Sequence, residues 1–187
     1  MKVHEQEMQS PFFQNIENLK PVIPSGNSDS ASLDNVFELL TTSGHSAPLA
    51  KLILIPDAWS KKSKVLPKEH LQLFNFLNSS MEPWDGPAAI AGTDNEWVIV
   101  ASDRNGLRPM RYTVTKDKLL FAGSETGMIN LNEKKIVSKG RLGPGDILGV
   151  RIEKGKVYTN KQIKNYLAKE YKNFNNQIID LDKKFPI

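Results

Sequence analysis

A glycine followed by short polar residues is the first stretch whose residue types could do chemistry. Gly26 and Asn27 precede Ser28, Asp29 and Ser30. Serine and aspartate are the residues that cap the start of a helix, because their side-chain oxygens accept hydrogen bonds from free backbone N–H groups. One cap is enough for one helix. The run therefore leaves polar groups that could hold a ligand at the same helix start.

A second group of charged residues surrounds an Asn-Gly dipeptide. Asp103 and Glu125 could form a carboxylate pair, but Arg104, Arg108 and Arg111 lie close to them in the sequence. Ion pairs that hold the corner of the chain together are the favoured interpretation, because structural ion pairs are more common than catalytic ones.

The remaining signals for catalysis or metal binding are absent from the sequence. His4, His45 and His70 lack the spacing of a metal site. The chain has no cysteine, which excludes a disulfide, a thiolate metal site and a cysteine nucleophile within it. We expect His70 to be an exposed residue on a helix. The sequence predicts no metal site and no complete catalytic set.

Four helical segments are expected before the strands. Leu33, Val36 and Leu40 have helical spacing after the capping run, and Gly44 is a suitable stop. Residues 48–56 could form a helix or a buried strand, and the proline near their start favours a helix. A third helix begins at Pro67, and a shorter one is expected over residues 12–19.

The second half of the chain has the pattern of antiparallel strands. Residues 97–125 contain two apolar runs and an alternating segment, separated by turns at Asn105-Gly106 and Lys116-Asp117, which predicts a three-strand meander. Three further strands are expected between residues 135 and 158, and a helix from Lys161. Helices followed by a run of strands indicate an α+β fold with helices on one face of a sheet.

Composition narrows the class of protein. The chain has 187 residues, of which 39% are hydrophobic and 25% charged, as in globular proteins. It has no apolar run long enough to cross a membrane, and its N-terminus is not a secretory signal. The net charge is +4, but the lysines are spread and few aromatics lie among them. A solvated surface is therefore favoured over a nucleic-acid site.

Several longer motifs resemble one known family. They are LKPVIPSGNSDSASLDNVFELL at residues 19–40, MEPWDGPAA at 81–89, DRNGLRPMRY at 103–112, AGSETG at 122–127 and KGRLGPGD at 139–146. Together and in this order, they closely resemble the class II glutamine amidotransferase domain of glutamate synthase large subunits.

The resemblance implies a fold and a division of the chain. The family fold is an N-terminal-nucleophile hydrolase sandwich with four α/β/β/α layers and antiparallel sheets. This chain would lack the first half of that sandwich. Residues 1–20 would be an arm cut from a larger domain, residues 21–160 the second half of the amidotransferase domain, and residues 161–187 a terminal helix leading toward the next domain.

The resemblance also implies an activity. In the family, an N-terminal cysteine hydrolyses glutamine to glutamate and ammonia, and the ammonia reaches 2-oxoglutarate at a flavin site to make a second glutamate. FMN and an iron–sulfur cluster are expected in the full-length parent enzyme and none in this chain. The expected partners are glutamine, the remainder of the large subunit and a small subunit, in the cytoplasm, with no nucleic acid or membrane.

Only one set of site residues carries over by position. Asp29 corresponds to the acidic residue that binds the α-amino group of glutamine, with Ser28 and Ser30 in support. The Asp103–Pro109 corner and residues 123–127 correspond to scaffold. The cysteine nucleophile, the arginine that binds the substrate carboxylate and the Asn-Gly pair of the oxyanion hole precede this segment in the family.

These absences make a fragment of the glutaminase domain the favoured interpretation. The alternatives are a non-catalytic module that binds glutamine or a partner, and one half of a split class II amidotransferase. The coding sequence immediately upstream would distinguish them, since an in-frame cysteine-first segment indicates truncation and a separate adjacent gene indicates a split enzyme.

The isolated chain is predicted to have no glutaminase activity. It lacks a thiolate nucleophile and the donors that stabilise a tetrahedral intermediate, so little stabilisation of the transition state remains. The measurement is ammonia release from glutamine by the purified chain. A cysteine-independent rate that Asp29→Ala abolishes would contradict the prediction.

Overall fold

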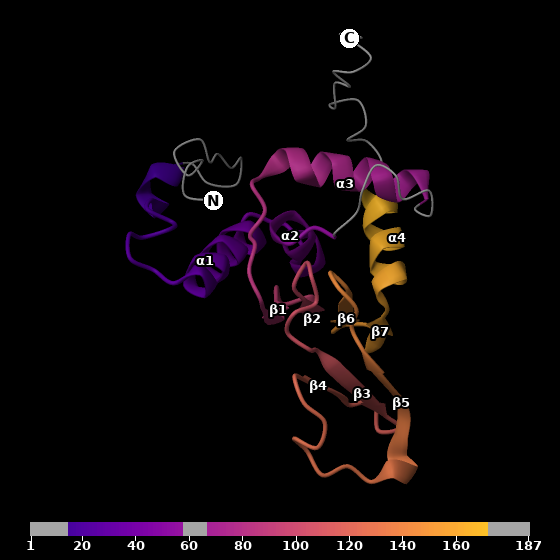
Figure 1. The fold of residues 1–187 in the computed structure, drawn as a ribbon. Coiled ribbons are helices and arrows are strands. Elements are labelled where there is room, and N and C mark those ends of the chain that lie inside the picture. The colour runs from indigo at the N-terminus through magenta and orange to yellow at the C-terminus, as the bar shows by residue number, and fades with distance from the viewer. Residues whose placement is uncertain (1–14, 58–66, 172–187) are drawn as a thin grey trace.

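The helices lie at one end of the molecule and the two sheets extend away from them (Figure 1). The structure is a computed structural model that describes residues 15–57 and 67–171. In these ranges the helical segments precede the strands, and the chain closes with one more helix. The predicted α+β class is confirmed.

The helices begin close to the positions that the sequence predicts. α1 covers Asp29–Thr42, α2 Ala47–Leu54, α3 Lys68–Ser80 and α4 Asn160–Glu170. The ambiguous apolar segment is thus a helix, α2, and it has a proline in its first turn as expected. The short early helix appears as a 3-10 turn, η2, over Ile16–Leu19.

The terminal helix is confirmed for its first half. Ile163 and Leu167 of α4 are fully buried and pack into the core beside α3 and β6. Three further apolar residues of the predicted terminal helix, Phe174, Ile178 and Leu181, lie outside the described residues.

The strands form two antiparallel sheets. The first has the order β1-β2-β6-β7, with β1 at Ala89–Thr93, β2 at Trp97–Ser102, β6 at Ile147–Arg151 and β7 at Lys156–Tyr158. The second has the order β4-β3-β5, with β3 at Arg111–Thr115, β4 at Leu120–Gly123 and β5 at Ile136–Arg141.

The predicted three-strand meander is wrong. β2 belongs to the first sheet, whereas β3 and β4 pair with each other in the second. The Asn105-Gly106 corner therefore carries the chain between sheets, and only Gly106 of the pair has a positive φ, +67°. The turn between β3 and β4 is confirmed, with Lys118 at φ +62°. Apolar patterns predict strands, but they do not predict which strands pair.

The two faces of β2 enter two different cores. Trp97, Ile99 and Ala101 pack with the helices in the main core. Val100 faces the other way, into a smaller cluster with Leu148, and the second sheet contributes partly buried side chains there. The layers therefore run helices, first sheet, second sheet, in agreement with three of the four layers implied by the family fold.

The corner between the sheets is organised by a buried carboxylate. Asp103 is 1% exposed and accepts hydrogen bonds from the backbone N–H groups of Asn105 at 3.0 Å, Leu107 at 3.1 Å, Arg108 at 3.0 Å and Ala88 at 3.3 Å. Burial alone would raise its pKa, but these donors hold the pKa of Asp103 below its usual value. The predicted ion pairing with arginine is wrong, because backbone N–H groups take that role.

A buried polar junction extends from this corner to the helices; it comprises Lys51, Asp57, Asp103, Gly145 and Lys164. The backbone N–H of Gly145 donates to the Asp103 carbonyl at 2.8 Å, and the Gly145 carbonyl accepts from Lys51 Nζ at 2.6 Å. Lys164 of α4 pairs with Asp57, just beyond α2. The junction thus joins both cores to the helical layer.

Lys51 is the buried cation of α2 in the junction. The residue is 1% exposed. Burial lowers the pKa of Lys51 to about 8, although the carboxylate of Asp57 acts in the opposite direction. Above that pH the folded chain holds a neutral amine, whereas the unfolded chain keeps its proton until the ordinary lysine pKa is reached.

The free energy of unfolding is predicted to rise by about 2 kcal/mol between pH 8 and 10 through Lys51, because in that window the unfolded state binds more protons. Above pH 10 the raised pKa of Tyr171, about 12, acts in the opposite direction. Urea unfolding across this range measures the effect.

Lys51→Met should remove this pH dependence, whereas Lys154→Met, at an exposed turn residue, should keep it. An unchanged pH dependence in Lys51→Met would contradict the assignment.

Candidate functional site

The start of α1 is the place where the predicted site residues come together. Ser28 is the N-cap, and its Oγ accepts a hydrogen bond from the backbone N–H of Ala31 at 3.2 Å. The hydroxyl oxygens of Ser28 and Ser30 lie 3.1 Å apart. Asp29 follows as the first residue of the helix. Ser28 therefore provides the cap, and Asp29 is left for another role.

The carboxylate of Asp29 is exposed and uncommitted. Within residues 15–57 and 67–171, its oxygens accept no hydrogen bond and form no ion pair. The N-terminus of α1 is itself electropositive, because its first N–H groups point outward. A cation could bind here only through the carboxylate. An α-ammonium group is a suitable ligand, since a charge-assisted bond to a carboxylate is strong.

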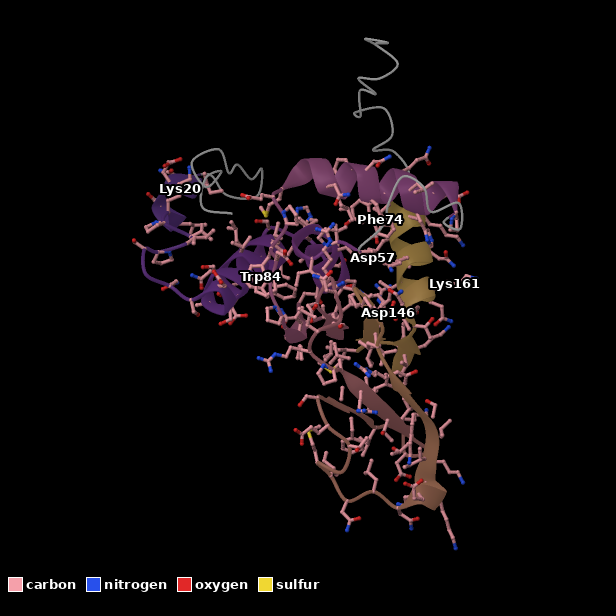
Figure 2. All side chains as sticks on the ribbon, viewed as in Figure 1. Lys20, Asp57, Phe74, Trp84, Asp146 and Lys161 are labelled. Carbon is pink, nitrogen blue, oxygen red and sulfur yellow. The ribbon has the colours of Figure 1, made fainter. Side chains whose placement is uncertain are left out.

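Two side-chain hydrogen bonds fix the position of this helix start. The indole N–H of Trp84 donates to the Asp29 carbonyl at 2.9 Å. The amide N–H of Asn35 donates to the Val22 carbonyl at 2.9 Å, which ties the segment before the helix to its second turn. Figure 2 shows Trp84 beside α1, far along the sequence from the helix that it contacts.

The second predicted group does not form an acid–base pair. Asp103 is enclosed by backbone donors in the corner between the sheets, and Glu125 is exposed after β4. A carboxylate with a lowered pKa and saturated acceptors is a poor general base. Asp103 therefore stabilises the corner between the sheets, and Glu125 makes no contact with it that would form a catalytic pair.

The prediction for His70 is wrong. The residue is 4% exposed, and its Nε2 lies 2.8 Å from Asn165 Oδ1 on α4. The ring also contacts Phe74 edge-on, with centroids 6.5 Å apart. Helix spacing placed this residue on α3, but only the packing of α4 across α3 buries it. His70 joins two helices and is not aimed at a site.

Neither a metal site nor a membrane span is found in the part of the chain that the structure describes. No three metal-ligating side chains gather there. None of its helices is both long and apolar enough to cross a bilayer.

The comparison with family sequences decides the class of this chain. The pattern described as "Glutamine amidotransferases class-II" matches residues 1–176. The chain belongs to the class II glutamine amidotransferases. In this family context, the uncommitted carboxylate at the start of α1 is a candidate for binding part of glutamine.

Individual relatives of this amidotransferase chain share one kind of name. It is 50% identical over 169 residues to "Glutamate synthase [NADPH] large chain" of Azospirillum brasilense, over 90% of this chain and 11% of the relative. It is 36% identical to the protein of that name from Bacillus subtilis (strain 168), over 91% of this chain and 11% of the relative. It is 38% identical to "Ferredoxin-dependent glutamate synthase 2, chloroplastic" of Arabidopsis thaliana, over 90% of this chain and 10% of the relative.

The amidotransferase chain thus spans about a tenth of the length of these relatives. Their names include different electron donors, NADPH and ferredoxin, although the matched region is similar in each. The matched region therefore does not determine the electron donor.

Trp84 is the residue in contact with the candidate site that the sequence did not predict. Residues 81–87 predict only a rigid loop, because they hold two prolines and a glycine. The available signal was a large aromatic residue in such a loop, because a buried indole N–H needs a hydrogen-bond partner. Its partner could not be inferred, since α1 lies more than fifty residues earlier.

Ser28→Ala is predicted to lower the free energy of unfolding by about 1 kcal/mol, because it removes the helix cap. Asp29→Asn should lower it by about 0.5 kcal/mol or less, since only its interaction with the helix dipole is lost. Urea unfolding at moderate salt measures both. A larger loss for Asp29→Asn than for Ser28→Ala would mean that the carboxylate is the cap.

Proposed function

We propose that this chain forms the ammonium-binding side of the glutaminase site in a glutamate synthase large subunit. The observation that carries the proposal is the uncommitted carboxylate of Asp29 at a helix start that Ser28 already caps. Membership of the class II amidotransferases and identities of 36–50% to two glutamate synthase large chains support it.

In this proposal, Asp29 accepts the α-ammonium group of glutamine and so sets the distance of the side-chain amide from the nucleophile. The nucleophile is a cysteine outside this chain, since the chain has none. Its thiolate attacks the amide carbon, the amide nitrogen takes up the proton that the thiol lost and leaves as ammonia, and water then hydrolyses the thioester to release glutamate. Ser28 and Ser30 support the carboxylate through the cap and the hydroxyl contact beside it.

The rest of the proposed activity lies in polypeptide outside this chain. About nine-tenths of the length of each of these relatives lies outside the matched region. The remainder of the large subunit would be the main partner, together with a small subunit, in the cytoplasm. FMN and the iron–sulfur cluster would bind to that remainder. For the cluster the reason is chemical, because a chain without cysteine offers it no thiolate ligands.

Asp29→Asn is predicted to raise the KM for glutamine about 10-fold or more, because a hydrogen-bonded charge pair to the ammonium group is lost. The assay uses the chain joined to a cysteine-first segment of the same family, with ammonia release as the readout.

The matched control is Asp34→Asn, which removes an exposed carboxylate further along α1. It should leave KM unchanged. Two results would overturn the proposal: a joined protein that hydrolyses no glutamine, or an Asp29→Asn variant with an unaltered KM.

A further inference from the structure

We propose that Trp84 is a positioning residue that sets where the Asp29 carboxylate stands, and so determines selectivity for substrates with an α-amino group. This inference rests on the proposed binding role of Asp29. It adds to that role a residue from a distant loop, whose indole N–H reaches the backbone of the binding residue itself.

The contact is directional. Trp84 Nε1 lies 2.9 Å from the carbonyl oxygen of Asp29, so it fixes the plane of the peptide that follows Asp29. With Ser28 as the cap on the other side, the backbone of Asp29 is held at both ends. The direction of its side chain is then set by the backbone, and only two side-chain torsions remain free.

Trp84 is itself held in place. The residue is 8% exposed, and its backbone N–H donates to the carbonyl of Leu54, at the end of α2, at 2.7 Å. Gly86 lies beneath the ring: a Cβ at that position would stand 2.7 Å from the indole Cη2. The loop between α3 and β1 therefore presents a rigid donor to the start of α1.

A purely structural role would not need the N–H group. Phenylalanine could fill most of the same apolar space without a polar atom to satisfy. The indole N–H adds a constraint on direction, and it acts on the carbonyl of the one residue whose carboxylate is left uncommitted at this helix start. A group that forms a salt bridge with an ammonium depends on such placement, because small displacements weaken a charge-assisted bond.

The test compares two substrates in the chain joined to a cysteine-first segment. One is glutamine, and the other is 4-carbamoylbutanoate, which is glutamine without its α-amino group. Trp84→Phe should raise the KM for glutamine about 3- to 10-fold, the effect of one lost neutral hydrogen bond. It should leave the KM for 4-carbamoylbutanoate unchanged and change kcat for glutamine less than KM.

A second variant keeps the test valid if Trp84→Phe does not fold. Site-specific replacement of Trp84 by its benzothiophene analogue puts sulfur in the place of the indole N–H and preserves the shape of the side chain. It should produce the same loss of selectivity.

The double variant Asp29→Asn with Trp84→Phe separates positioning from general damage. If Trp84 acts through Asp29, Trp84→Phe should have no further effect once the carboxylate is gone. Equal changes for both substrates, a fall in kcat at constant KM, or additive effects in the double variant would overturn the proposal for Trp84.

Failure of the underlying function would look different. If Asp29→Asn alone preserves the preference for glutamine over 4-carbamoylbutanoate, then Asp29 does not bind the ammonium group, and both the proposed function and this inference are wrong. If Asp29→Asn abolishes the preference while neither Trp84 variant changes it, the function stands and only the inference is wrong.

Discussion

The connection between the two sheets depends on one buried carboxylate, that of Asp103. At Asp103 the chain leaves the first sheet, and three backbone N–H groups of the corner that follows bind its side chain. A buried charge is costly unless hydrogen bonds satisfy it, so this corner has one favourable conformation. The Asp103 carbonyl accepts from Gly145, whose own carbonyl accepts from Lys51 of α2. Both crossings between the sheets are thereby tied to the helical layer.

The candidate site depends on that rigidity without sharing its residues. α2 ends at Leu54, whose carbonyl holds the backbone of Trp84, and the indole of Trp84 reaches the first residue of α1. A carboxylate on a short side chain binds selectively only if the backbone that carries it is fixed in position. In the proposed site, the apolar core and the buried junction supply this support, and Asp29 supplies the charge.

The proposed binding role of Asp29 would orient the substrate but would not by itself accelerate the reaction. An ammonium–carboxylate contact places a substrate, but the rate comes from groups that bind the transition state more tightly than the substrate. Neither a thiolate nor a set of oxyanion donors is assigned to this chain. We therefore propose that this chain orients the substrate, whereas the covalent step depends on residues that lie elsewhere in the polypeptide.

The sequence by itself determined the α+β class, helices before the strands, a helix cap within residues 28–30 and the family motifs, because these depend on local propensity and on residue order. Only the tertiary structure decided that β2 and β3 lie in different sheets, that His70 is buried and that Asp103 binds backbone groups. It alone placed Trp84 beside Asp29. Each of these depends on contacts between residues far apart in the chain, and local spacing carries no information about such partners.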